Sequence, residues 1–258
     1  MKETSDIIRK LGIGKGKPKI CVPLVGRSLE ALLKEAAILR EIPCDLAEWR
    51  ADYFDGLQDP VALAAALPAI QEALGQIPLL FTIRTKLEGG EVELSSTSYL
   101  HCNQQALESG IPVLVDAELS KGDEIIQTMA ESAHSCGAAI IGSRHDFQKT
   151  PSREEIIENL CRMKALGADI AKYAVMPNTP RDVLTLLDAT LTMKENYPEI
   201  PVVTMAMGKL GGASRVTGGV FGSCITFGAA QHTSAPGQLP ARQLDEFLTA
   251  LQPLSETI

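Results

Sequence analysis

Short apolar runs rich in β-branched residues recur along the chain. Eight runs stand out, at residues 19–25, 44–50, 79–84, 113–119, 138–143, 168–174, 201–205 and 219–226. Most segments between them have the spacing of apolar positions that indicates an amphipathic helix, as at residues 28–40, 60–74, 98–109, 123–136, 152–166 and 180–197. Several begin with a capping side chain beside a proline, as at Asp59-Pro60 and Thr179-Pro180, which is typical of a helix start.

Strands that alternate with helices form a parallel sheet. Eight such units in 258 residues favour one closed (β/α)8 barrel, a TIM barrel, over an open doubly wound sheet. The Gly-x-Gly-x-x-Gly signature of a Rossmann fold does not follow the first predicted strand. Residues 11–18, rich in glycine, are interpreted as a short N-terminal hairpin that closes the barrel bottom. Because no linker is visible, we expect residues 1–258 to form a single (β/α)8-barrel catalytic domain.

The composition narrows the class of protein. Hydrophobic residues make up 45% of the chain and charged residues 22%, as in ordinary globular proteins. The net charge of −8 argues against a nucleic acid or an anionic membrane as a partner. No apolar stretch suits a signal peptide or a membrane span, and the six cysteines form no C-x-x-C pair. We therefore expect a cytoplasmic protein with reduced thiols.

Polar side chains gather in or just after the predicted strands. In chain order they are Glu48, Arg50, Arg84, Asp116, Glu118, His145, Lys172, Arg215, Ser234 and Gln238. Barrel enzymes build their active sites at the C-terminal ends of the strands. Each residue alone is weak support, but their recurrence on most strands predicts an active site at that face.

Lys172 lies inside an apolar predicted strand, where a charged amine is expensive to bury. Its free pKa of about 10.4 would fall with desolvation and with nearby arginines, and a neutral amine can attack a carbonyl to form an imine. A lysine paired with a carboxylate at a strand edge would give the same pattern. His145, one strand away, suits proton transfer near neutral pH and favours the catalytic interpretation over a loop histidine bonded to Asp146.

Three arginines, Arg50, Arg84 and Arg215, have the forked geometry that holds a substrate carboxylate or hydroxyls. Asp116 and Glu118 suggest either a Mg²⁺ site or, more often for a carboxylate pair in one strand, salt bridges. No histidine or cysteine cluster indicates zinc, so we expect no metal. Residues 228–240 are interpreted as a covering loop with polar tips, or else as a plain connector.

At these positions the chain resembles the type I 3-dehydroquinate dehydratases over nearly its whole length. The shared motifs are Glu-Trp-Arg at 48–50, Phe-Thr-Ile-Arg at 81–84, Glu-Gly-Gly-Glu at 88–91, Ser-Arg-His-Asp-Phe at 143–147, Lys172 before Met176-Pro177, Thr-Met-Ala-Met-Gly at 204–208, Ser-Arg at 214–215, Val-Phe-Gly-Ser at 220–223 and Ser-Ala-Pro-Gly-Gln at 234–238.

The resemblance implies the cis-dehydration of 3-dehydroquinate to 3-dehydroshikimate in the shikimate pathway. Lys172 would form the imine, His145 would move protons, and Glu88 would hold His145 in the useful tautomer. The imine is the electron sink, so no metal or cofactor is expected. The implied substrate-binding residues are Glu48 and Arg84 for ring hydroxyls, with Arg50 nearby, Arg215, Ser234 and Gln238 for the carboxylate and covering loop, and Met205, Met207 and Phe227 for an apolar wall. The resemblance also implies a homodimer.

The chain departs from the family pattern at three positions, and two rival functions are left open. Ala117 is smaller than the usual aliphatic residue. Pro23 stands where some family members have serine, and Arg144 would add positive charge beside His145 and lower its pKa. A class I aldolase-like lysine-imine lyase is the alternative activity; glycine pairs at 211–212 and 218–219 would suit its phosphate, whereas Arg215 favours a carboxylate. A non-catalytic barrel would have lost Lys172 or His145. Biosynthetic and quinate-catabolic roles are equally compatible with these residues.

Overall fold

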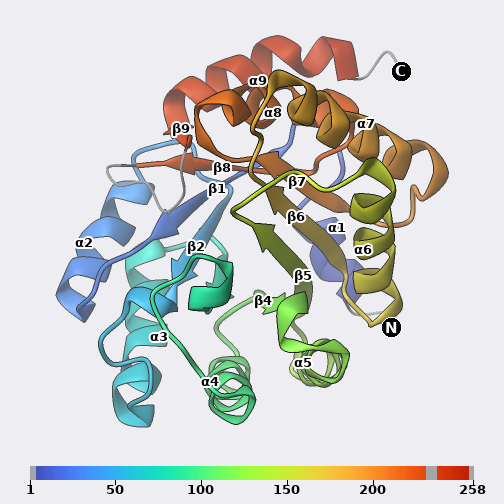
Figure 1. The fold of residues 1–258 in the computed structure, drawn as a ribbon. Helices are drawn as coiled ribbons and strands as arrows, with labels where there is room; N and C mark the ends of the chain where they lie inside the picture. The colour runs from blue at the N-terminus through green and yellow to red at the C-terminus, as the bar shows by residue number, and fades with distance from the viewer. Residues whose placement is uncertain (1–3, 231–236, 256–258) are drawn as a thin grey trace.

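The protein folds as a parallel barrel with helices on its outside (Figure 1). The computed structural model describes residues 4–230 and 237–255. The barrel strands are β1 (Lys19–Leu24), β2 (Leu46–Arg50), β3 (Leu79–Thr82), β4 (Leu114–Glu118), β5 (Ala139–Asp146), β6 (Ile170–Val175), β7 (Val202–Ala206) and β8 (Ile225–Ala229). They pair in parallel in the order β7-β6-β5-β4-β3-β2-β1-β8, and β9 (Leu239–Pro240) pairs with β8. The predicted fold class is confirmed.

The barrel closes between β7 and β8 through a small number of contacts. Val202 and Ser223 form an isolated parallel bridge, and the Cys224 N–H donates to the Val202 carbonyl at 2.8 Å. The Thr204 N–H donates to the Ser223 hydroxyl at 3.1 Å. A serine side chain therefore supplements the backbone ladder where the two strands meet.

Helices cover the outside of the strands, and two of them begin at the capping residues predicted, Asp59 and Thr179. They are α2 (Leu29–Leu39), α3 (Pro60–Leu74), α4 (Ser96–Glu108), α5 (Asp123–Ser135), α6 (Arg153–Ala165), α7 (Pro180–Asn196), α8 (Gly208–Phe221) and α9 (Ala241–Ser255), with short 3₁₀ turns η1 (Ala51–Tyr53), η2 (Lys86–Glu88) and η3 (Leu119–Lys121). Asp59 accepts from the Val61 N–H at 2.9 Å, and Thr179 forms a capping box with Asp182. Within the described residues, no helix is long and apolar enough to cross a membrane.

Alternation along the strands divides the core into two shells. Outward side chains such as Trp49, Phe81 and Tyr173 pack under the helices. Inward side chains at the lower ends of the strands fill the barrel; they include Cys21, Leu46, Leu80, Leu114, Ile141, Ile170, Val203 and Ile225. The barrel interior is therefore apolar at the bottom, and polar inward positions occur only toward the C-terminal ends.

The predicted N-terminal hairpin is wrong. A helix, α1 (Thr4–Lys10), and the turn after it close the bottom of the barrel. The apolar side chains that pack onto the inner shell here are Ile7, Ile8, Leu11 and Ile13. Gly12, Gly14 and Gly16 have φ angles of 63°, 80° and 63°, which produce successive tight turns rather than extended strands.

The eighth predicted strand was placed too early, because residues 219–221 belong to α8 and β8 begins at Ile225. Five glycines make α8 a poor helix by propensity. Tertiary packing explains two of them: a Cβ on Gly211 would lie 2.0 Å from the Ala206 carbonyl oxygen, and one on Gly219 would lie 2.3 Å from the Pro18 ring. The glycines let α8 approach the barrel closely, and this position carries Arg215 toward the strand ends.

Two adjacent glycines in α8 predict opposite stability changes. Gly211→Ala should lower the free energy of unfolding by about 1–3 kcal/mol, because its methyl group would overlap the backbone at Ala206. Gly212→Ala meets nothing within 4 Å and should raise it by about 0.5–1 kcal/mol, because alanine has the better helix propensity. Urea denaturation of both variants measures the difference. Equal stabilities would contradict this packing of α8.

Candidate active site

The strand ends bring one polar layer together above the apolar interior. Along β2, β4 and β5, the inward positions two residues apart change from apolar to polar: Leu46 is followed by Glu48, Leu114 by Asp116, and Ile141 by Ser143. β5 extends to Asp146, so His145 is a strand residue rather than a loop residue. The period-two geometry of the strands therefore aims the polar side chains at one another.

The layer lines a cavity that opens at the C-terminal face of the barrel. Eleven of the twelve predicted site residues line it: Glu48, Arg50, Arg84, Glu88, His145, Lys172, Met205, Met207, Arg215, Phe227 and Gln238. Ser234, the twelfth, lies outside the described residues. Gly89, Phe147 and Ala174 also line the cavity and were not predicted. The structure therefore brings eleven of the predicted residues together at one cavity.

The amine of Lys172 is buried between carboxylates and an aromatic ring. Its Nζ lies 3.5 Å from Asp116 Oδ2 and 3.9 Å from Glu48 Oε1. The ring centroid of Phe227 lies 4.4 Å from the same nitrogen, which is cation–π distance. A carboxylate beside this lysine was the alternative that the sequence left open, and the structure places Asp116 and Glu48 next to the nitrogen.

His145 and Glu88 form a hydrogen-bonded pair, with 2.8 Å between Nδ1 and Oε2. Burial and the positive charges of Arg84, Lys172 and Arg50 hold the pKa of His145 well below its usual value. Burial raises the pKa of Glu88 to about 7, against the opposing effect of Arg84. The imidazole is therefore neutral at neutral pH and able to accept a proton.

Arg144 does not act on His145 as the sequence suggested. It is the register partner of Tyr173, and its charge acts on the pKa of that side chain. Successive side chains of a strand point to opposite faces, so Arg144 faces the helices while His145 faces the cavity. The cations that lower the pKa of His145 come from other strands.

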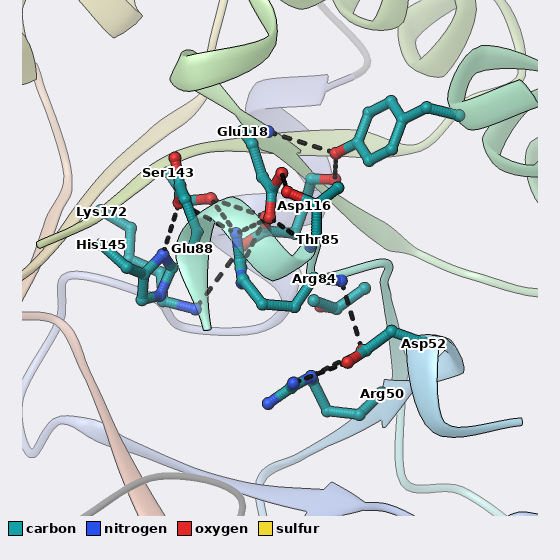
Figure 2. Close-up of polar contacts among 12 residues, drawn as sticks. Arg50, Asp52, Arg84, Thr85, Glu88, Asp116, Glu118, Ser143, His145 and Lys172 are labelled. Atoms are coloured by element: carbon teal, nitrogen blue, oxygen red, sulfur yellow. Dashed lines mark hydrogen bonds and ion pairs between the residues drawn. The ribbon is translucent and has the colours of Figure 1, made fainter. Parts of the chain in front are cut away.

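Arg84 joins the polar layer together (Figure 2). Its guanidinium donates to Asp116 at 2.8 Å, to Glu118 at 3.0 Å and to Ser143 at 3.0 Å, and its contact with Glu88 is 3.4 Å. Asp116 and Glu118 thus form salt bridges, one of the two alternatives the sequence left open. In the part of the chain that the structure describes, no group of three or more histidine, cysteine, aspartate or glutamate side chains is placed to hold a metal ion.

Arg50 is held by Asp52, a residue that the sequence did not predict for the site. Asp52 accepts from Arg50 Nε at 2.7 Å and from Nη2 at 2.8 Å, and it also accepts from the Arg84 backbone N–H at 3.2 Å. Ser143 was overlooked as well. Its position two residues before His145 on the same strand face was the available signal, whereas Asp52 lies in an irregular turn that no periodicity marks.

Arg215 reaches the cavity from α8. Its Nη1 lies 3.6 Å from the Met205 sulfur and 3.5 Å from the Phe227 carbonyl oxygen. Burial lowers the pKa of Arg215 to about 10, so its side chain stays positively charged at neutral pH. A cation beside the apolar Met205 and Phe227 can receive an anionic group from a ligand.

Fold and site together define a class: a (β/α)8-barrel enzyme with a buried lysine and a histidine–carboxylate pair at the C-terminal face. A family model described as Type I 3-dehydroquinase matches residues 20–255. The chain belongs to the type I 3-dehydroquinase family. Membership favours the dehydratase over the aldolase-like alternative.

Curated relatives and solved structures agree with this assignment. The 3-dehydroquinate dehydratase of Klebsiella pneumoniae is 47% identical over 95% of this chain and 97% of its own length, and that of Bacillus licheniformis is 46% identical over 95% and 96%. A crystal structure of the Clostridium difficile type I enzyme with covalently modified comenic acid has a TM-score of 0.90 at 42% identity, covering 95% of this chain and 96% of that one.

The pKa of His145 can be measured directly. In an NMR titration its ring protons should keep the chemical shifts of the neutral form through neutral pH and change only well below pH 6.5. The lowered pKa has this sign because burial and three neighbouring cations disfavour the imidazolium. A His145→Gln variant identifies the resonance by its disappearance. A midpoint at or above 6.5 would contradict the electrostatics of the site.

Proposed function

We propose that this protein dehydrates 3-dehydroquinate to 3-dehydroshikimate through an imine on Lys172, with His145 as the acid–base group. The observation that carries the proposal is the convergence of Lys172 and the hydrogen-bonded His145–Glu88 pair on one buried cavity. Family membership supports the same reaction, a hydro-lyase step of the shikimate pathway.

The groups suit an elimination next to a ketone. An imine on Lys172 withdraws electrons and acidifies the neighbouring carbon. An ionised Glu88 accepts a hydrogen bond from His145 Nδ1–H. This tautomer leaves the Nε2 lone pair free to remove the carbon-bound proton. The same proton can then pass to the departing hydroxyl, so that one histidine serves both halves of the elimination.

The binding roles follow the distribution of charge in the cavity. Arg215, together with Gln238 and Ser234, is proposed to hold the substrate carboxylate. Glu48 and Arg50 are proposed to bind ring hydroxyls, with Arg84 both lining the cavity and fixing the carboxylates behind it. Met205, Met207 and Phe227 form the apolar wall.

We also propose that the chain is a single catalytic domain in the cytoplasm and assembles as a homodimer. These proposals rest on the family resemblance and on the continuous arrangement of strands around one barrel. Sedimentation equilibrium at micromolar concentration would decide the oligomeric state, and a monomer would reject the dimer without affecting the catalytic assignment.

Two variants separate the covalent role from the acid–base role. Borohydride added with 3-dehydroquinate should attach one ligand mass to Lys172, as mapped by peptide mass spectrometry. His145→Ala should still form this adduct but lose about 10²- to 10⁴-fold in kcat, because proton transfer is removed. Lys172→Ala should form no adduct and show no turnover. An adduct on another lysine, or near-normal turnover of His145→Ala, would reject the assignment.

Arg215 should act on binding more than on turnover. Arg215→Met keeps much of the buried aliphatic volume but removes a charge-assisted contact worth about 1.5–3 kcal/mol, so KM should rise on the order of 10- to 100-fold. Arg162→Met, on the outer helix α6 where Arg162 pairs with Asp123, is the matched control and should leave KM unchanged. A fall in kcat alone would point to a different role.

A further inference from the structure

Asp116 lies behind the cavity with one carboxylate oxygen fixed and the other directed at Lys172. Oδ1 accepts from the Ser143 hydroxyl at 2.6 Å and from Arg84 Nη2 at 2.8 Å. Oδ2 is buried without a hydrogen-bond partner among the described residues, and Lys172 Nζ lies 3.5 Å from it. Figure 2 shows Arg84, Ser143 and Lys172 converging on this side chain.

Several elements contribute the charged and titratable groups that face the lysine nitrogen. Glu48 from β2 is 3.9 Å away, but the same oxygen accepts from Thr82 at 3.0 Å. Cys21 from β1 is a neutral thiol, because burial and Glu48 raise its pKa. His145 from β5 is neutral because its pKa is lowered. Asp116 and Glu48 are therefore the anions beside the nitrogen, and Arg84 is the cation behind them.

We propose that Asp116, held by Ser143 and Arg84, is the counter-ion of the protonated imine on Lys172 and keeps that imine protonated during the elimination. The inference rests on the proposed function and adds a residue to it. When the neutral amine of Lys172 condenses with the substrate ketone, the nitrogen forms a double bond to carbon, and its two protons leave with the carbonyl oxygen as water. The imine nitrogen then binds one proton and carries the positive charge.

The protonated form matters because only a cationic imine is a strong electron sink. A neutral imine would not accept the electron pair released when the neighbouring C–H bond breaks. A carboxylate in contact with the nitrogen favours the charged form, and in a buried site its effect is screened less than at the surface.

Asp116 suits this role better than Glu48. Although burial raises its pKa, Arg84 and Lys172 hold the pKa of Asp116 below its usual value, so it remains ionised. Two short hydrogen bonds to Oδ1 fix its short side chain, and no part of the residue is exposed. Glu48 instead lines the cavity, where it is available to substrate hydroxyls.

Three variants test the proposal. Asp116→Asn removes the charge at similar volume, and Ser143→Ala removes the hydroxyl that fixes the carboxylate. Glu118→Gln is the matched control: Glu118 lies on the same strand, is equally buried and pairs with Arg84 at 3.0 Å, but it is hydrogen-bonded to Thr85 rather than directed at Lys172. Each variant is first compared with the wild type by circular dichroism and thermal unfolding.

The readout is a rapid borohydride quench with 3-dehydroquinate across a pH series, with the Lys172 adduct measured by mass spectrometry. Hydride adds to the protonated imine, so the yield reports that species. Asp116→Asn should lose the adduct at a pH lower than the wild type by on the order of one unit, and the alkaline limb of kcat should move the same way. Ser143→Ala should shift in the same direction by less. Glu118→Gln should lose the adduct at the same pH as the wild type, even though its turnover falls because an ion pair of Arg84 is removed.

The experiment distinguishes failure of the proposed function from failure of the counter-ion role of Asp116. If the wild-type adduct is absent or maps to another lysine, the proposed function itself is wrong. If wild-type Lys172 is trapped but folded Asp116→Asn keeps the wild-type profile, Asp116 is not the counter-ion. An equal shift in Glu118→Gln would overturn the inference by assigning the effect to Arg84. Should Asp116→Asn not fold, Ser143→Ala decides: a shift supports the proposal, and an unchanged profile rejects it.

Discussion

The buried ion pairs of Arg84 are the interaction on which the site depends. Asp116 and Glu118 of β4 and Glu88 of η2 all contact this guanidinium, and each of the three carboxylates is at least 98% buried. A buried carboxylate without a partner is strongly unfavourable, and breaking a buried ion pair costs about 3–5 kcal/mol. Arg84 therefore determines whether the acidic residues can be placed inside the barrel at all.

The same charge also sets the proton chemistry of the site. Arg84 opposes the rise in the pKa of Glu88 and contributes to the low pKa of His145. A single cation thus favours an ionised carboxylate and a neutral imidazole within one hydrogen-bonded pair. In this combination the carboxylate accepts a hydrogen bond from Nδ1–H, and Nε2 is free to act as a base. Arg84 therefore both stabilises the buried carboxylates and sets the protonation states that the reaction needs.

Local periodicity predicted the barrel and the polar residues at its strand ends, whereas Glu88 and the apolar wall were predicted only from the family resemblance. Lys172 was identifiable as a charge in an apolar strand, and His145 by its neighbouring strand. The contact between Lys172 and Asp116 was not predictable, because it joins β6 to β4 across the intervening β5. Such contacts depend on the curvature and stagger of the barrel, which no short window of sequence encodes.

The errors have a similar origin. The helix α1 has only seven residues, too few for a clear 3.6-residue period, so the glycine-rich turn after it was taken for a hairpin. The glycines of α8 are unfavourable for a helix by propensity, whereas close packing against Ala206 and Pro18 requires two of them, Gly211 and Gly219. In both places tertiary contacts outweigh local preference.

The apolar lower half of the barrel strengthens the electrostatic interactions within the polar layer. Buried side chains from all eight strands fill the interior below Lys172, so the charged groups meet solvent only through the cavity at the C-terminal face. Electrostatic interactions in such a setting are stronger than in water. The substrate that fills the cavity would displace the remaining solvent and strengthen them further. The bottom of the barrel therefore contributes to catalysis although none of its side chains touches the reacting atoms.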